Sequence, residues 1–201
     1  MRIISGKYRS KTIHPPKNFK ARPTTDFAKA GLFNILNNFL DYETVRVLDL
    51  FSGTGSISFE FASRGCTAID AVESDHLHAE FIRRTAKELG FEGFRTIKSD
   101  VFVFIRHAKT SYDLVFCDPP YEMEGIEYLP ASILEAGLVT PGGLFIFEHS
   151  GRYSFEQVES FTEERHYGSV HFSFFRPRIK SPNSFELQKK DLILQHQKTV
   201  R

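Results

Sequence analysis

From residue 45 onward, apolar stretches of strand length alternate with amphipathic stretches of helix length, and the connections between them are short. This alternation is typical of a mostly parallel sheet that helices cover on both faces. The strands are predicted at residues 45–50, 67–72, 94–98, 112–117, 143–147, 161–167 and 169–175. The helices are predicted at residues 56–63, 75–89, 101–108, 125–136 and 154–159. Because Gly168 joins the last two strands, we expect them to pair antiparallel at one edge of a seven-stranded α/β sheet.

The residues before 45 follow a different pattern. Residues 2–14 predict a short hairpin that ends at Pro15-Pro16. A helix is expected to begin within Arg22-Pro-Thr-Thr-Asp26, capped by Thr or Asp, with an apolar face made of Phe27, Ala30, Phe33 and Leu36. We therefore divide the 201 residues into a basic N-terminal hairpin or arm at 1–20, the α/β domain at 21–175 and a basic tail at 176–201.

The net charge of +1 conceals an asymmetry along the chain. Residues 1–30 carry eight Lys or Arg against one acid, whereas residues 31–175 carry 11 basic and 22 acidic residues. A basic segment on an acidic body suits a nucleic-acid backbone, because Lys and Arg release counterions from phosphates. The alternative is a solvated, loosely ordered terminus. The candidate RNA-binding residues are Arg2, Lys7, Arg9, Lys11 and Arg22.

Other features of the sequence bear on membrane insertion, export and metal binding. No apolar run reaches the ~20 residues of a membrane span, and the first residues hold no apolar stretch of signal-peptide length. Cys66 and Cys117 have no His or Cys partner at metal-ligand spacing, so we expect buried thiols and no metal site. We expect a cytoplasmic protein that does not contact a membrane.

Polar residues follow each of the first three predicted strands, at the edge where ligands bind in such sheets. The first strand leads into Asp49-Leu-Phe-Ser-Gly-Thr-Gly55, whose glycines let the turn pass close to a ligand. Glu73 can accept both ribose hydroxyls, and Asp100 can accept from an adenine amino group or simply cap the next helix. This order fits a nucleoside-bearing cofactor without a pyrophosphate. The candidate cofactor residues are Asp49, Ser52, Gly53, Gly55, Glu73, Asp100 and Val101.

The fourth strand is followed directly by Asp118-Pro119-Pro120-Tyr121. Consecutive prolines cannot donate backbone hydrogen bonds and have fixed φ angles, so the Asp118 side chain and nearby carbonyls are left as acceptors. An amino nitrogen held there donates two hydrogen bonds, which turn its lone pair toward an electrophile. Tyr121 offers a face on which a planar base can stack. We take Asp118, Pro119 and Tyr121 as the candidate catalytic residues for methylation of an amino group.

These motifs resemble those of Rossmann-fold S-adenosylmethionine methyltransferases that modify amino groups. The sequence further resembles the RsmD family, which methylates guanine N2 in bacterial small-subunit ribosomal RNA. The resemblance spans about residues 1–175 and is most specific at 118–121 and 22–26. It is also carried by Arg2-Ile-Ile-Ser-Gly-Lys-Tyr-Arg9, Leu32-Phe-Asn34 and residues 47–57. Ser10 departs from the family pattern, which has glycine after the arginine.

The resemblance implies a class I methyltransferase fold with a mostly parallel sheet and a small N-terminal hairpin. It implies S-adenosylmethionine as cofactor and 16S ribosomal RNA, or an assembling small subunit, as partner. We expect the enzyme to act as a monomer.

Other functions remain open on the residues alone. A DNA enzyme, or another RNA enzyme that methylates adenine N6 or cytosine N4, would use the same chemistry, although 201 residues leave little room for a DNA target-recognition domain. A carbon-5 pyrimidine enzyme needs a presented cysteine nucleophile, and a protein-amide enzyme usually starts the Pro-Pro-Tyr turn with Asn. A non-catalytic nucleic-acid-binding protein and a hydride-transferring enzyme fit the motifs less well.

Overall fold

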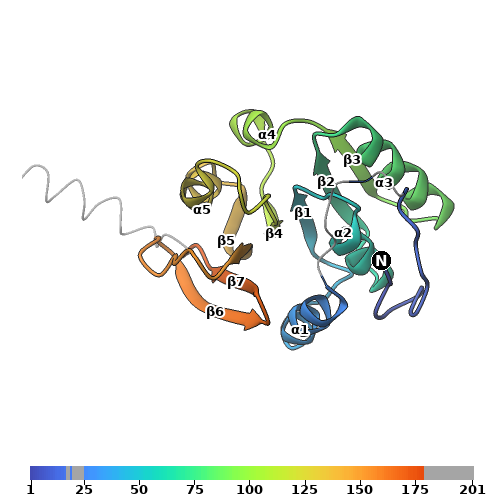
Figure 1. Ribbon diagram of the computed structural model, residues 1–201, viewed down its shortest axis with the longest axis horizontal. Coiled ribbons are helices and arrows are strands. Elements are labelled where there is room, and N and C mark those ends of the chain that lie inside the picture. The colour runs from blue at the N-terminus through green and yellow to red at the C-terminus, as the bar shows by residue number, and fades with distance from the viewer. Residues whose placement is uncertain (17–18, 20–24, 179–201) are drawn as a thin grey trace, which may run out of the picture.

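The computed structural model describes residues 1–16, 19 and 25–178. Within this part of the chain, seven strands form one sheet in the order β3-β2-β1-β4-β5-β7-β6 (Figure 1). The first five strands are parallel, and β7 pairs antiparallel with both β5 and β6, which confirms the predicted edge pair. The strands are β1 (Arg46–Leu50), β2 (Ala68–Glu73), β3 (Phe94–Lys98), β4 (Tyr112–Cys117), β5 (Val139–Ser150), β6 (Phe161–Tyr167) and β7 (Val170–Phe175).

Helices cover both faces of this sheet, as predicted. Figure 1 shows α1, α2 and α3 on one face and α4 and α5 on the other. Separate apolar clusters, one centred on Phe33 and Phe61 and the other on Tyr112 and Phe145, hold the two layers to the sheet. The helices are α1 (Asp26–Leu36), α2 (Ser56–Ser63), α3 (His76–Glu88), α4 (Val101–His107), the 3-10 helix η1 (Ile126–Tyr128) and α5 (Leu129–Glu135).

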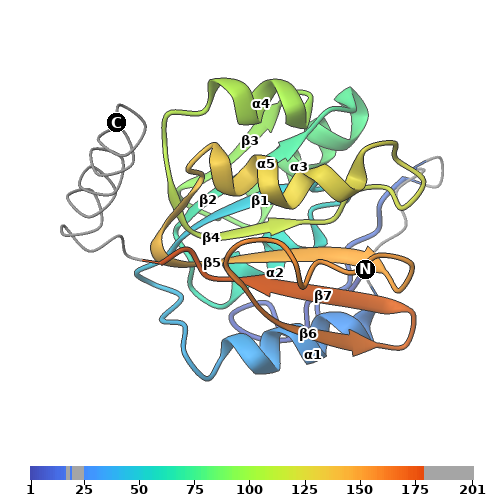
Figure 2. The same ribbon diagram turned by 90° about the vertical axis from the view of Figure 1, so that its left-hand side faces the viewer.

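Strand order reverses between β1 and β4, and Figure 2 shows the parallel strands ending at a common edge. The turn between β6 and β7 lies at that same edge, and α1 runs beneath these two strands (Figure 2). A ligand site is expected at this edge, because the loops that follow β1 and β4 diverge there.

One sequence-based prediction about a helix was wrong, and another was only partly right. Residues 154–159 form turns, because Phe155 is buried against the rings of Phe147 and His149 while the chain returns toward β6. The predicted helix at 125–136 is divided into η1 and α5, since Pro130 in the first turn of α5 has no N–H to continue a hydrogen-bonded helix.

The predicted apolar face of α1 was also partly wrong. Phe27 is 69% exposed, and the fully buried Lys29 occupies the inner face beside Leu32 and Phe33. Thr25 caps the helix by accepting a hydrogen bond from the backbone N–H of Ala28, as expected. None of the helices in the described ranges is long and apolar enough to cross a membrane.

Residues 1–16, called the N-terminal segment below, double back on themselves as predicted. A single antiparallel bridge joins Arg2 to Thr12, and Ile3 and Ile13 are buried against α2 and α3. Ser10 has a φ of 67°, the left-handed conformation that glycine adopts without strain. The serine therefore adopts here a conformation that suits glycine better.

Candidate functional site

A cavity of about 560 Å³ opens at the edge where the parallel strands end. Its size is within the range typical of small-molecule sites. The wall is formed by the loop from β1 to α2, the ends of β2, β4 and β5, the first residue before α1, and the start of β7. Lining residues include Asp49, Phe51, Ser52, Gly53, Glu73, Asp118, Pro119, Tyr121 and Glu148.

The loop after β1 is bent tightly around this cavity. Phe51 has a φ of 60°, an uncommon conformation for a bulky residue that costs about 1–3 kcal/mol. Gly55 has a φ of 77°, and a Cβ atom there would lie 2.9 Å from the Phe59 ring. The Ser52 hydroxyl donates to the carbonyls of Asp49 and Val72 at 2.8 and 3.1 Å, which ties the loop to the sheet. The positive φ angles of Phe51 and Gly55 and the hydrogen bonds of Ser52 thus fix the shape of the loop beside the cavity.

Glu73 at the end of β2 positions the same loop. Its Oε2 accepts from the backbone N–H of Gly53 and its Oε1 from that of Asp75, each at 2.8 Å. The carboxylate is nearly buried, and it faces the cavity. Each oxygen still has a second lone pair with which it can accept a ligand hydroxyl.

Asp100 and Val101 lie apart from the other cofactor candidates. Asp100 caps α4, with its Oδ1 accepting from the backbone N–H of Val103 at 3.0 Å. Val101 is buried in the apolar cluster beneath α4. Neither is among the described residues that line the cavity, so their role toward a cofactor stays a prediction.

The Asp118–Tyr121 motif lines the same cavity as the glycine loop. The backbone N–H of Asp118 donates to the Leu50 carbonyl at 3.3 Å, which joins the start of the motif to the end of β1. Tyr121 donates its hydroxyl to Oε1 of Glu148 at 3.2 Å, and this fixes the ring against the end of β5. All three candidate catalytic residues line the cavity.

The cavity is strongly acidic. Burial raises the pKa of Asp49 to about 7, although hydrogen bonds from Ser58 oppose the shift. Burial also raises the pKa of Asp118 well above its usual value, and the nearby Glu148 and Asp49 raise it further. Four carboxyl groups face the cavity and, among the described residues, no Lys or Arg does. Such a wall favours a ligand with positive charge and hydroxyl groups over a phosphate.

Glu148 is a site residue that the sequence-based prediction missed. It ends the apolar stretch Leu144-Phe-Ile-Phe147 of β5 and is almost fully buried. A single acid at the carboxyl end of a buried strand is the signal that identified Glu73, so the same rule could have found Glu148.

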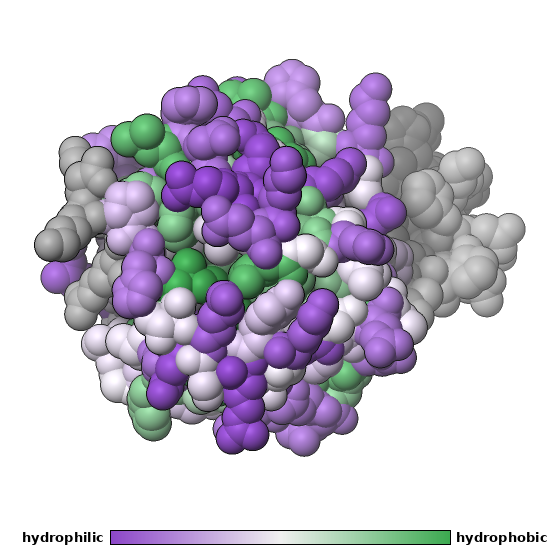
Figure 3. Space-filling view, turned by 90° about the vertical axis from the view of Figure 1, so that its right-hand side faces the viewer, coloured by the Kyte–Doolittle hydropathy of each residue, from purple (hydrophilic) through white to green (hydrophobic). Residues whose placement is uncertain are grey.

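The candidate RNA-binding residues lie on a different part of the molecule. Lys7, Arg9 and Lys11 are exposed on the N-terminal segment. Arg2 forms a 3.1 Å ion pair with Asp26 at the start of α1, so part of its charge is neutralised. The face that carries α3 and this segment is mostly hydrophilic (Figure 3). Arg22 lies outside the described residues.

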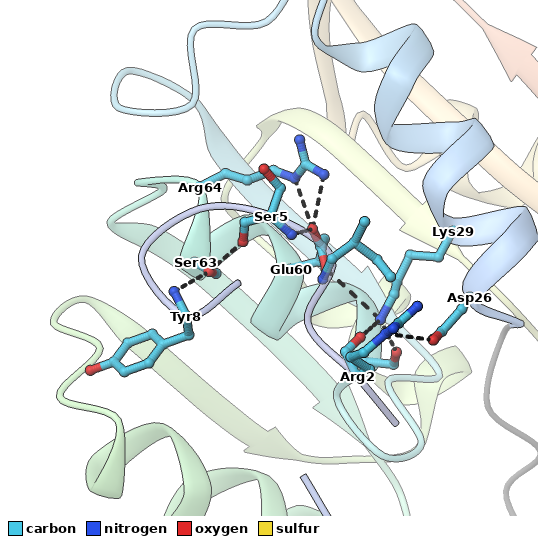
Figure 4. A network of polar contacts seen from close by, with 10 residues as sticks. Arg2, Ser5, Tyr8, Asp26, Lys29, Glu60, Ser63 and Arg64 are labelled. Atoms are coloured by element: carbon cyan, nitrogen blue, oxygen red, sulfur yellow. Dashed lines mark hydrogen bonds and ion pairs between the residues drawn. The ribbon is translucent and has the colours of Figure 1, made fainter. Parts of the chain in front are cut away.

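The N-terminal segment is tied to the domain by a buried acid on α2. Glu60 accepts hydrogen bonds from the backbone N–H groups of Ile4 and Ser5 at 2.7 and 3.0 Å (Figure 4). Arg64 donates to the same carboxylate at 3.0 Å, and the Lys29 ammonium lies 3.8 Å from it. The interpretation of residues 1–16 as a loosely ordered terminus is therefore wrong.

Lys29 links this network to the cavity. Its ammonium donates to the carbonyl of Arg2 at 2.7 Å and to the hydroxyl of Ser56 at 3.0 Å (Figure 4). Ser56 is the first residue of α2 and lines the cavity. Burial lowers the pKa of Lys29 despite the attraction of Glu60.

Comparison with known proteins identifies the family. The family described as "Conserved hypothetical protein 95" matches residues 1–176. The chain belongs to this family. The ribosomal RNA small subunit methyltransferase D of Buchnera aphidicola subsp. Baizongia pistaciae is 26% identical over 148 residues, which cover 74% of this chain and 75% of that protein. The resemblance to the RsmD family is confirmed.

Solved structures show the same fold. A hypothetical protein from Thermus thermophilus has a TM-score of 0.76 at 28% identity, covering 88% of this chain and 99% of that one. A 16S rRNA N2 methyltransferase from T. thermophilus, in complex with AdoMet and guanosine, has a TM-score of 0.62 at 18% identity, covering 80% of this chain and 45% of that one. The Rossmann-like methyltransferase fold is thereby confirmed.

Proposed function

We propose that this protein transfers a methyl group from S-adenosylmethionine to the exocyclic N2 amino group of a guanine in small-subunit (16S) ribosomal RNA. The observation that carries the proposal is the acidic cavity that the glycine loop and Asp118–Tyr121 both line. The name of the Buchnera relative supports ribosomal RNA as the substrate class. The bound AdoMet and guanosine of the T. thermophilus enzyme support the donor and the base.

The described residues fit S-adenosylmethionine. The donor carries a sulfonium and an ammonium group, and a wall with several carboxyl groups and no described Lys or Arg favours both charges. Glu73 can accept its ribose hydroxyls, while the glycine loop leaves room for close approach. When bound, the donor supplies an electrophilic methyl group.

Asp118 and Tyr121 then hold the acceptor. Asp118 accepts a hydrogen bond from the guanine amino group, and the Pro119 carbonyl provides a second acceptor. Tyr121, fixed by Glu148, offers its ring face to the base. Methylation would make the amino nitrogen cationic; the carboxylate of Asp118 would stabilise this charge, and the surplus proton would then pass to that carboxylate or to water. Positive charge from the donor favours the ionised form of Asp118, which burial alone disfavours.

The division of charge between cavity and surface accounts for how RNA is presented. The acidic cavity repels phosphates, so only an uncharged base enters it. The exposed Lys7, Arg9 and Lys11 are available to contact the RNA backbone outside. The base therefore has to leave its stack before methyl transfer.

The test is incubation with labelled S-adenosylmethionine and either unmodified 16S rRNA or unmodified small-subunit particles, followed by nuclease digestion and mass spectrometry. We expect label in N2-methylguanine at one position. Label in adenine or cytosine, or transfer to DNA in preference to ribosomal RNA, would contradict the proposal. A comparison of the two RNA substrates also establishes which assembly state the enzyme accepts.

A further inference from the structure

Two aromatic rings lie side by side next to the cavity, outside the residues already assigned a role. Phe27 is in the first turn of α1, and Tyr167 ends β6. Their ring centroids are 5.8 Å apart, and the rings meet edge to face. We call Phe27 and Tyr167 the aromatic pair.

The two rings differ in how firmly they are held. Tyr167 lies over the backbone of α1, so closely that a Cβ atom on Gly31 would be 2.1 Å from its ring. It also packs against Phe172 in the apolar cluster beneath the sheet. Phe27, in contrast, is 69% exposed although its neighbour is fixed. A large apolar side chain that is kept this exposed on an ordered helix is available to a partner.

The position of the pair connects it to the cavity. Thr25, which precedes α1, lines the cavity on one side of the pair, and Ser169 and Val170, which follow Tyr167, line it on the other. Each ring is thus two residues along the chain from a lining residue. The pair therefore lies close to the rim of the cavity, within reach of a nucleotide next to a base inserted there.

The basic N-terminal segment reaches the start of α1, because Arg2 pairs there with Asp26, beside Phe27, at 3.1 Å. The inside of the cavity is acidic, so phosphates are kept at the outer surface. Unstacked RNA bases are commonly bound by aromatic rings, and such stacking tolerates any base.

We propose that the aromatic pair is a stacking platform for the nucleotide adjacent to the methylated guanine. The proposal rests on the proposed function, because it places the neighbour of a base that enters the cavity. Phe27 presents the ring face on which that nucleobase stacks, and Tyr167 supports Phe27 from below. The platform holds the backbone in the unstacked form from which the target base can enter.

The first test compares steady-state methylation by the wild type, Phe27→Ala, Phe27→Leu and Phe27→Trp. Stacking on one aromatic ring predicts a KM for RNA that is about 5- to 100-fold higher in Phe27→Ala. We expect kcat, and the affinity for S-adenosylmethionine by calorimetry, to be unchanged. Phe27→Leu should resemble Phe27→Ala, because an apolar side chain without a ring cannot stack, and Phe27→Trp should restore the wild-type KM. The matched control is Phe39→Ala, a 46% exposed Phe beyond the other end of α1.

The second test replaces Phe27 with the photoreactive p-benzoylphenylalanine and maps its cross-link on 16S rRNA. A cross-link within one or two nucleotides of the methylated guanine supports the platform, and one elsewhere overturns it. An unchanged KM in Phe27→Ala, with an active wild type, overturns the platform alone. An effect on assembled particles but not on protein-free rRNA would mean that Phe27 contacts a protein, and the proposal would be wrong. A wild type that methylates no RNA would overturn the proposed function and the platform together.

Discussion

The buried acid Glu60 and the buried acids around Asp118 have opposite surroundings. Glu60 on α2 receives two backbone N–H groups and lies beside Arg64 and Lys29. Asp118, at the end of β4, instead lies near Glu148 and Asp49, whose charges add to burial in raising its pKa. The first carboxylate is fully compensated within the protein. The second has neighbours of like charge and faces a cavity.

This difference separates a structural acid from one that is prepared for a ligand. A buried charge that is paired and hydrogen-bonded holds elements together, and removing one partner is costly. Buried acids that raise one another's pKa are destabilising until a positively charged ligand arrives, and such groups concentrate at functional sites. Glu60 should therefore affect stability, and Asp118 should affect the reaction.

Glu60→Gln is expected to cause the largest change, a loss of about 3–5 kcal/mol in the free energy of unfolding. The amide cannot compensate the buried Lys29, and it offers one oxygen where the carboxylate offered two. Urea unfolding followed by circular dichroism measures the loss. Glu88→Gln is the matched control, because Glu88 pairs with Arg84 on the exposed face of α3 and should change stability by less than about 0.5 kcal/mol. A loss below about 1 kcal/mol for Glu60→Gln would remove the distinction between the two groups.

Asp118→Ala is expected to slow methyl transfer about 10²- to 10³-fold, because an acceptor and a stabilising charge are lost together. Its stability should be equal to that of the wild type or higher, since a like charge is removed. Single-turnover assays at saturating S-adenosylmethionine isolate the chemical step. Asp118→Asn keeps an acceptor oxygen and should lose less. Transfer by Asp118→Ala within about threefold of wild type would show that Asp118 is not catalytic.

Asp49→Asn should stabilise the ligand-free protein at pH 8 and have little effect at pH 4. The pKa of Asp49 is raised from 3.8 to about 7, so the folded state binds more protons than the unfolded state in this interval and wild-type stability falls as pH rises through it. We expect Asp49→Asn to increase the free energy of unfolding by roughly 1–3 kcal/mol at pH 8. The whole pKa shift of Asp49 corresponds to about 4 kcal/mol, but asparagine accepts a weaker hydrogen bond from Ser58, so the gain is smaller. Denaturant unfolding at both pH values gives the difference, with Glu80→Gln on the surface as control. Equal effects at pH 4 and pH 8 would contradict the assignment.

Lys7→Ala combined with Lys11→Ala should weaken RNA binding without changing the surroundings of Glu60 or Asp118. The slope of log affinity against log salt is negative, and each lost phosphate contact makes it shallower by about 0.7–0.9. Side-chain changes are preferable to deletion of residues 1–12, which would remove the N–H donors of Ile4 and Ser5 from Glu60. Lys109→Ala, which removes one positive charge from an exposed position just before β4, is the control for a general charge effect. An unchanged slope in the double variant would show that this charge serves only solvation.

Local signals in the sequence predicted most of the sheet and much of the site. Glycines after a strand and the Asp118–Tyr121 turn can be recognised because the backbone constraint is contained in a few consecutive residues. The predicted strands all appear, and Asp49, Ser52, Gly53, Glu73 and Asp118 line one cavity, whereas the candidate Gly55 is not among its described lining residues.

Features that depend on distant partners could not be predicted in this way. Lys29 is a charged residue of a type that is normally solvated, and the Arg2 carbonyl, Ser56 and Glu60 explain its burial. Phe27 was assigned to the apolar face because its spacing is helical, but Lys29 is buried instead and Phe27 contacts the Tyr167 ring while staying 69% exposed. The sequence shows the helical spacing of the apolar residues, but the elements that pack against the helix decide which of its faces is buried.

The attachment of the N-terminal segment to α2 determines the order in which the chain can fold. Ile4 donates to Glu60, 56 positions further on, and the Tyr8 hydroxyl donates to the carbonyl of Leu89, 81 positions further on. The N-terminal segment thus lacks its partners on α2 and at the end of α3 until both helices have been synthesised. Contacts of such wide separation form late, because the entropy of closing the loop must be overcome first. The N-terminal segment therefore completes the fold, and Ile3 and Ile13 stay exposed on every nascent chain that lacks α3.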